Sequence, residues 1–475
     1  MKTFYSINSL FWLVVITVFI WLVVFPMFQL GMFTDGMLYA SISRNFYLGQ
    51  GSWWNIYSHE PTKIFFHEQP PLVFWLQSFF FQIIGDSVYT ERVYSLVLIL
   101  LNGVIILFFW KELNNESKTA WIPILLWLSI YSVRFSAINN LIENTLQFFD
   151  LCSVYFLLKA IKEEKWFIKL LLGLGFLFLA SLSKGFQGLF PIATPFCYWL
   201  AFRNFPLKKL LLFSFFLVFG IFGIYYLLFQ SPEIHESYKA YFASRFPGFP
   251  FTPHTNTNNR LYLFSQLIIE LIPPIIICGI IFLIAKKFFI RFKIESKYLI
   301  ERKLLLFFFL VGFTASIPLM ISYEQRFFYL TTSMPFFVLG LSIVIKNYVI
   351  QIDSILRNKL SFLKRLNATL FILICIGIIA TLLFAGRVTR DKELLSDVFV
   401  IGEKVKGEDL IDISNSGWNN WTSHTYFRRY FNIELVSGAC GHKYFLVPKN
   451  ENPQNSNSFK TVEWNTTYYN VYTTN

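Results

Sequence analysis

Long apolar stretches alternate with short polar segments along most of the chain. A helix needs about twenty mainly apolar residues to cross a bilayer. The sequence contains eleven stretches near that length, several of them short or next to a proline or a charge. We therefore predict an α-helical polytopic membrane protein with about eleven transmembrane helices, in a range of about ten to thirteen. The predicted spans lie near 10–30, 93–110, 120–137, 144–160, 168–183, 186–202, 210–229, 263–285, 303–321, 327–345 and 368–385.

Three segments depart from this pattern. The apolar run 72–84 is too short to span and follows Pro70-Pro71, which predicts a helix lying on the membrane surface within the loop 31–92. A second long loop covers 230–262. After residue 386, polar and β-prone residues alternate, as in 409–414 and 444–447, which predicts a small α/β domain over 387–475. Its last stretch, 450–475, fits either a strand pair or a disordered tail. Residues 1–386 are then the transmembrane domain.

Composition supports a membrane protein and argues against a soluble domain or a disulfide-linked fold. Hydrophobic residues make up 55% of the chain and charged residues 15%, with a mean hydropathy of +0.51. Soluble domains carry about 25% charged residues. Four of the five cysteines lie inside apolar runs, so no disulfide framework is indicated.

The distribution of basic residues predicts the orientation. With a cytoplasmic N-terminus, 22 of the 41 Lys and Arg residues fall in cytoplasmic segments and nine in the outer loops, the other ten lying in the tail. The loops 31–92 and 230–262 and the tail are therefore expected outside. The compact loops and the lack of a targeting peptide favour a bacterial inner membrane. The net charge of +13 is dispersed among short loops, and we expect no nucleic-acid partner.

Two carboxylates stand at outer ends of predicted spans. Asp35 follows the first span within Thr34-Asp35-Gly36, and Tyr39 comes after it at helical spacing. A carboxylate at this position can face a docked substrate, although the same tripeptide also suits a turn or a helix cap. Glu143 lies in the short turn before the fourth span. Alternatively, Glu143 stabilises the N-terminus of the fourth span.

Several cations lie on the sparsely basic outer side. Lys184 occupies a glycine-rich turn, where it either contacts a phosphate or extends along the membrane to the headgroups. Arg260 precedes a span, and Arg326 precedes Tyr329. Together such cations suit phosphate oxygens, which the planar arginine fork matches well. For Arg92 we expect instead an ion pair with Glu91 or a bond to a carbonyl.

Histidines near these loops raise the question of a metal. His67 and Glu68 are adjacent, and His59, His235 and His254 are also on the outer side. Their spacing is not that of a recognised metal site. We expect no cofactor and keep a divalent metal as the less favoured alternative.

Short motifs in a fixed order carry a resemblance to a known family. They are Thr34-Asp35-Gly36 with Tyr39-Ala40, Glu68-Gln69-Pro70-Pro71-Leu72 with Trp75, Glu91-Arg92 with Ser95, Ser183-Lys184-Gly185 with Pro191, Arg260 with Tyr262 and Pro273-Pro274, and Arg326 with Tyr329 and Pro335. In order and topological side this set resembles the C-type membrane glycosyltransferases of the protein O-mannosyltransferase and lipid A aminoarabinose transferase family. Members of that family use polyprenyl-phosphate sugars.

The resemblance implies roles for these residues. Asp35 would be the catalytic carboxylate that orients or deprotonates the acceptor, and Glu143 would be the second acidic residue. Gln69 departs from the aminoarabinose type, which has a lysine before the two prolines. The residues implied in binding the substrate and the lipid phosphate are Lys184, Arg260, Arg326, Tyr329, Glu68, Gln69 and Tyr39.

The predicted function is inverting transfer of a sugar from a polyprenyl-phosphate donor to a lipid, glycan or protein acceptor among membrane lipids. Such a site needs cations where phosphate charge develops and one carboxylate for the acceptor's proton. The alternative is a transporter or flippase of lipid-linked envelope precursors, although transporters place ionisable groups mid-span. A non-catalytic assembly protein is a third hypothesis.

Overall fold

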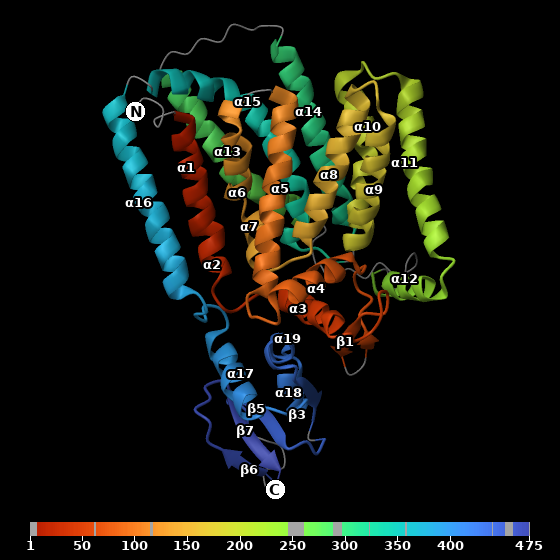
Figure 1. The fold of residues 1–475 in the computed structure, drawn as a ribbon, viewed down its shortest axis with the longest axis vertical. Helices are drawn as coiled ribbons and strands as arrows, with labels where there is room; N and C mark the ends of the chain where they lie inside the picture. The colour runs from red at the N-terminus through yellow and green to blue at the C-terminus, as the bar shows by residue number, and fades with distance from the viewer. Residues whose placement is uncertain are drawn as a thin grey trace.

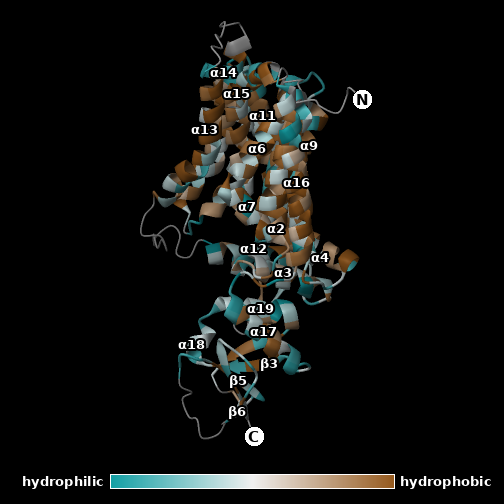
Figure 2. Ribbon diagram, turned by 90° about the vertical axis from the view of Figure 1, so that its left-hand side faces the viewer, coloured by the Kyte–Doolittle hydropathy of each residue, from teal (hydrophilic) through white to brown (hydrophobic). Residues whose placement is uncertain are grey.

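The computed structural model describes residues 7–60, 63–114, 117–245, 261–287, 297–322, 324–356, 359–438, 440–451 and 459–474. Figure 1 shows three layers: a bundle of long helices, a thin layer of short helices with a hairpin below it, and a small domain with a sheet. The bundle is mostly apolar, as the colours of Figure 2 show. This order of layers is the one predicted from the sequence.

Long helices and short helical turns that continue them build the bundle. They are α1 (Ile7–Phe19), η1 (Ile20–Val24), α2 (Phe25–Met27), α5 (Thr90–Asn114), α6 (Trp121–Ser129), α7 (Tyr131–Ile138), α8 (Glu143–Lys162), α9 (Phe167–Lys184), η3 (Gly185–Ala193), α10 (Thr194–Phe202), α11 (Leu207–Leu228), α13 (Tyr262–Lys287), α14 (Lys297–Ser316), η4 (Ile317–Ile321), η5 (Phe327–Ser333), α15 (Met334–Leu356) and α16 (Leu360–Phe384), with η2 (Ser117–Thr119) before α6.

Among the described residues, eight helical segments are long and apolar enough to cross a membrane, or nine if bent α6 and α7 form one span. Nine spans are two fewer than the eleven predicted, and the difference arises at two places. The segment Phe167–Phe202 counts once, although its 36 residues would extend about 54 Å as one straight helix, well beyond the membrane core. Figure 1 shows its two parts, α9 and α10, side by side. Helix α8 is not counted, because Glu143, Gln147 and Asp150 lower its hydropathy.

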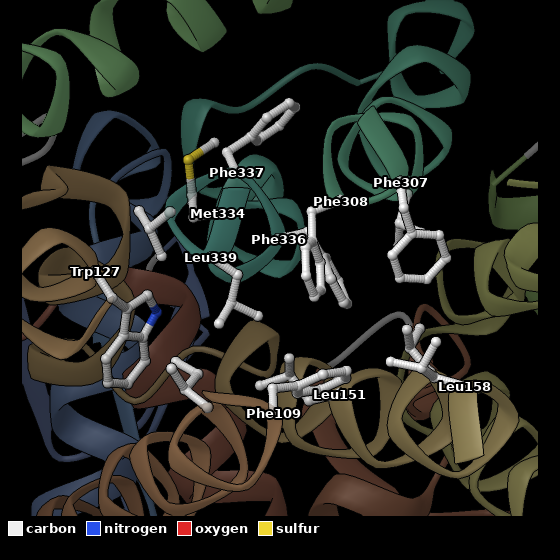
Figure 3. Close-up of a cluster of buried hydrophobic side chains, with 14 of the residues drawn as sticks. Phe109, Trp127, Leu151, Leu158, Phe307, Phe308, Met334, Phe336, Phe337 and Leu339 are labelled. Carbon is white, nitrogen blue, oxygen red and sulfur yellow. The ribbon is translucent and has the colours of Figure 1, made fainter. Parts of the chain in front are cut away.

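Interlocking aromatic and aliphatic side chains hold the bundle together. Figure 3 shows Phe109 of α5 facing Phe308 of α14 and Phe336 of α15, with Leu151 of α8 beside them. The ring centroids of Phe109 lie 6.0 Å from Phe308 and 6.4 Å from Phe336 in edge-on contacts, a favoured geometry for aromatic pairs. This packing holds α8, which begins at Glu143, against α5, α14 and α15.

A carboxylate stabilises the break between α6 and α7, which bend by 78°. The first N–H groups of a helix lack partners within it, and in an apolar bundle water does not supply them. Glu270 of α13 is buried and accepts a hydrogen bond from the backbone N–H of Ser132 at 2.9 Å. Helix α7 is thus held at an angle and leads directly into the loop 139–142.

The middle layer consists of short elements. It contains α3 (Thr34–Tyr47), the antiparallel strands β1 (Tyr57–Glu60) and β2 (Lys63–Phe65), α4 (Leu72–Ile84) and α12 (Pro232–Arg245). Helix α4 is the predicted surface helix: its 13 residues are apolar but too few to span. In Figure 1 it lies between the bundle and the C-terminal domain.

In its described residues, the C-terminal domain has a five-stranded sheet and three helices. The sheet has the order β4-β3-β5-β7-β6, parallel across β4, β3 and β5 and antiparallel across β5, β7 and β6. Residues 459–474 form the strand pair that was one of the two alternatives for the tail. The elements are α17 (Lys392–Lys404), β3 (Leu410–Ile413), α18 (Asn415–Trp418), α19 (Trp421–Phe431), β4 (Glu434–Ser437), β5 (Tyr444–Pro448), β6 (Phe459–Val462) and β7 (Tyr469–Thr474).

Buried ion pairs join this domain to the layer above it. Arg429 of α19 lies 2.7 Å from Glu91 and 2.8 Å from Asp86, and Arg429 and Glu91 are both almost fully buried. Arg44 of α3 donates to the carbonyl oxygens of Arg428 at 2.8 Å and Arg429 at 2.9 Å. Helix α3 is therefore held directly by α19.

Of the two partners predicted for Arg92, the carbonyl is confirmed. Its guanidinium donates to the carbonyl oxygen of Met27. Glu91 pairs instead with Arg429, which lies 338 positions away and which local spacing could not indicate.

Replacing Arg429 by Gln is expected to destabilise the protein by about 3–5 kcal/mol, because Glu91 would remain buried without its cation. Thermal unfolding of the purified protein measures the change. As the matched control, Lys443→Gln removes an exposed ion pair with Glu408 in the same domain, and its melting temperature should equal that of the wild type. Equal melting temperatures for both variants would contradict the proposed importance of the buried pair.

Candidate functional site

Asp35 lies in the first turn of α3, at the end of the bundle that faces the C-terminal domain. Its side chain is half-buried. Burial and the nearby negative charge of Glu143 raise the pKa of Asp35 to about 6, while Arg326 and Lys184 act in the opposite direction. The carboxyl group can therefore release and take up a proton near neutral pH.

Close backbone contact places Asp35 beside the loop 139–142. The side-chain oxygen of Asn139 accepts from the N–H of Phe33 at 2.8 Å, and the Asn140 amide donates to the carbonyl of Gly36 at 3.1 Å. A Cβ atom at position 36 would collide with the carbonyl of Asn139. Gly36 is therefore required for close approach within a helix. The alternative of a turn at Thr34-Asp35-Gly36 is wrong, since these residues begin α3.

Glu143 and Lys184 form a buried ion pair next to Asp35. Glu143 is the first residue of α8, so it does occupy a helix N-terminus, as the structural alternative proposed. Lys184 is the last residue of α9 and is followed by Gly185 with a positive φ of 66°. The Lys184 ammonium contacts the Glu143 carboxylate and lies 3.7 Å from the ring centroid of Tyr329. The Lys184 side chain thus contacts other side chains of this protein. The alternative in which it extends toward the lipid headgroups is wrong.

Arg245 is a site cation that the sequence analysis missed. It ends α12, and its Nε donates to the backbone carbonyl of Glu68 at 2.7 Å. Its other nitrogens lie 3.5 Å from the Glu68 carboxylate and 3.8 Å from that of Glu324. Burial opposes its charge, but Tyr39, Glu68, Tyr329 and Glu324 together raise the pKa of Arg245. Like Lys184, Arg245 is a basic residue in a segment predicted to lie outside, where basic residues are few. Its positive charge on that side is the signal that could have identified it.

The other predicted site residues occupy varied positions. Arg326 is exposed and immediately precedes η5, which carries Tyr329. Tyr39 lies one helical turn after Asp35 and is buried; burial, Asp35 and Glu143 raise its pKa well above the usual value. Gln69 is buried just before Pro70. Arg260 lies outside the described residues.

His67 contacts a hydroxyl group. Its Nδ1 lies 3.1 Å from Ser237 Oγ, and burial lowers the pKa of the imidazole, which favours its neutral form. Within the described part of the chain, no three His, Cys, Asp or Glu side chains are grouped so that they could hold a metal ion. His254 is outside the described residues.

Comparisons with known proteins find one matching family model and similar folds. The family model described as dolichyl-phosphate-mannose-protein mannosyltransferase matches residues 68–231. The matched segment contains Glu68, Gln69, Glu143 and Lys184, and Asp35 precedes it. A comparison with curated proteins gives no significant sequence match.

Solved structures show the same fold. The chain is similar to ArnT from Cupriavidus metallidurans bound to undecaprenyl phosphate, with 16% identity, a TM-score of 0.65 and coverage of 98% of both chains. The apo state of that ArnT gives 15% identity, a TM-score of 0.64 and coverage of 97% of both. The polytopic fold predicted from the sequence is therefore confirmed. With the family-model match, the resemblance to C-type membrane glycosyltransferases is confirmed as well.

Replacing Gly36 by Ala is expected to cost about 1–3 kcal/mol, the usual cost of overpacking, because the new methyl group must displace the Asn139 carbonyl. Gly103→Ala in α5 is the matched control, since a Cβ there meets only ordinary contacts at 3.9 Å. Thermal unfolding should show a loss for the first variant and none for the second. A Gly36→Ala protein as stable as the control would refute the close approach.

Proposed function

We propose that this chain is an inverting glycosyltransferase that moves a sugar from a polyprenyl-phosphate donor to an acceptor hydroxyl at the extracytoplasmic face of a membrane. The observation that carries the proposal is the position of Asp35, a titrating carboxyl beside a buried lysine. The structural neighbour bound to undecaprenyl phosphate supports the donor class. The proposal includes a cytoplasmic N-terminus, on the distribution of basic residues, and a bacterial inner membrane, on the compact loops.

The donor phosphate would be held by Lys184 and Arg245. Lys184 has three N–H donors and uses one toward Glu143, so it can also donate to a phosphate oxygen. The contacts of Arg245 to the carboxylates of Glu68 and Glu324, at 3.5 and 3.8 Å, are longer than the 2.7–2.9 Å typical of direct charge-assisted bonds. A phosphate can therefore replace these carboxylates as the partner of the Arg245 guanidinium at a small cost in free energy. Arg326 adds a third cation at the exposed rim of the site.

Asp35 would act on the acceptor. As the acceptor oxygen attacks the anomeric carbon from the face opposite the phosphate, the bond between that carbon and the phosphate oxygen breaks. The hydroxyl proton passes to the Asp35 carboxylate, and the polyprenyl phosphate leaves with one additional negative charge. Lys184 and Arg245 would stabilise that charge as it develops. A base with a pKa of about 6 is ionised at neutral pH and still strong enough to take a proton.

Glu143 would act as a positioning residue. It fixes the Lys184 ammonium over the Tyr329 ring and raises the pKa of Asp35. Both effects serve the reaction without contact between Glu143 and the substrate. Neither the family match nor the fold supports the transporter alternative.

Asp35→Asn is expected to lower turnover about 10²–10⁴-fold, because the amide cannot accept the proton. The assay follows release of undecaprenyl phosphate from a panel of undecaprenyl-phosphate hexoses and pentoses, with native membrane extract as the source of acceptor. The wild-type profile of kcat/KM should rise with pH and level off above about 6, as expected when the free enzyme must have Asp35 ionised. A folded Asp35→Asn variant with full activity would eliminate this assignment.

Arg326→Gln provides the control for the pH profile. Arg326 is exposed and lowers the pKa of Asp35, so its removal raises that pKa. The midpoint of the profile should move to higher pH while the plateau is retained at saturating donor. An unchanged midpoint would mean that another group controls the profile.

Lys184→Met should weaken binding of undecaprenyl phosphate about tenfold to a hundredfold, because a hydrogen bond to a charged group contributes about 1.5–3 kcal/mol. Binding is measured with the purified protein in detergent. Because the single variant leaves Glu143 buried without a cation, the double variant Lys184→Met, Glu143→Gln is measured beside it as a neutral pair. Full affinity in the folded double variant would rule out Lys184 as a phosphate ligand.

A further inference from the structure

A polar groove of about 430 Å³ lies in the C-terminal domain beside the candidate site. It is formed by the start of α17 and the start of α19, with one tyrosine from the end of the sheet. Its lining residues are Asp391, Lys392, Glu393, Leu394, Asn420 and Thr422, together with Tyr468.

Hydrogen bonds connect the walls of this groove to the segment that carries Asp35. The hydroxyl of Thr422 lies 3.0 Å from that of Thr34, the residue immediately before Asp35. The hydroxyl of Tyr426 lies 2.8 Å from the Asp391 carboxylate and 3.1 Å from the backbone carbonyl oxygen of Met32. The rim of the groove is thus connected by one hydrogen bond to Thr34, the residue next to the proposed base.

The groove presents groups that bind hydroxyls. The Asn420 amide donates to the Tyr468 hydroxyl at 3.1 Å, which fixes both groups in the wall. Tyr468 also contributes the aromatic ring of the lining. Aromatic faces next to amide, hydroxyl and carboxylate groups suit a ligand with one apolar face and many hydroxyls.

The charges of the groove select against phosphate. Asp391 and Glu393 bring two carboxylates, and Lys392 brings one ammonium. Like charges at close range disfavour a bound anion. The donor side is different, because Lys184 and Arg245 provide its cations.

We propose that this groove is the acceptor subsite and that it binds a neutral, hydroxyl-rich carbohydrate portion of the acceptor. The inference rests on the proposed transferase function and names the chemical class of its acceptor. A sugar in the groove would present a neighbouring hydroxyl to Asp35 across Thr34. The domain would thereby determine specificity while the bundle holds the donor.

Saturation-transfer NMR on the purified full-length protein tests the groove. The probes are the neutral disaccharides maltose, cellobiose and mannobiose, with glucose 1-phosphate as the anionic comparison. The wild type should bind at least one disaccharide and bind glucose 1-phosphate more weakly. Tyr468→Ala and Glu393→Gln should each weaken disaccharide binding about tenfold, a loss equal to one aromatic or polar contact.

Two controls make the result specific. Glu408→Gln changes a carboxylate of the same domain that pairs with the exposed Lys443, and it should bind disaccharides like the wild type. Binding of undecaprenyl phosphate should be equal in all these variants, because none touches the proposed phosphate ligands.

The outcomes separate the inference from the proposed function. Absence of disaccharide binding, or binding that Tyr468→Ala and Glu393→Gln leave unchanged, would overturn the acceptor subsite even if the donor is consumed normally. Stronger binding of glucose 1-phosphate than of every disaccharide would also overturn it. Disaccharide binding that depends on Tyr468, in a protein that consumes no donor, would retain the groove and remove the transferase.

Discussion

The arrangement of the site depends on the buried ion pair between Glu143 and Lys184. Removing two charges from water costs several kcal/mol per ion, and only close partners offset that cost. Here the pair joins the end of α9 to the start of α8, and the Tyr329 ring covers the ammonium from η5. Three segments of the bundle are therefore fixed at one point. The pair also sets the field at Asp35, whose pKa responds to both of its charges.

Helix α3 connects this point to the C-terminal domain. On one side, Asn139 and Asn140 bind its first turn to the bundle through backbone groups. On the other, α19 contacts it through Thr422 at the first turn and through backbone carbonyls at Arg44. Asp35 stands in the turn that both sides hold. A change in the domain therefore reaches the proposed base through one short helix, which is the physical basis for placing the acceptor subsite in that domain.

Hydropathy and local chemistry predicted the fold because those signals are local. The spans follow from apolar length, α4 from a short apolar run after two prolines, and the tail domain from alternating residues. The contact partners of individual residues could not be predicted from these local signals. Glu91 was placed next to Arg92 by proximity in sequence, whereas its cation is Arg429. The close approach at Gly36 could not be predicted either, since nothing in the sequence shows that the Asn139 carbonyl lies against it. Pairings over such separations are fixed by packing alone.

Under the proposed function, Arg245 would supply the cation that Gln69 lacks. Relatives of the aminoarabinose type carry a lysine before the two prolines, and the uncharged Gln69 removes that cation. In this chain the guanidinium of Arg245 binds the backbone carbonyl of Glu68, the residue next to Gln69. A cation therefore lies beside the same segment, although it comes from α12 on another loop. An arginine also offers a planar pair of donors to phosphate oxygens, which lysine does not. The departure at position 69 thus changes the source of the positive charge, and the substitution is compatible with a polyprenyl-phosphate donor.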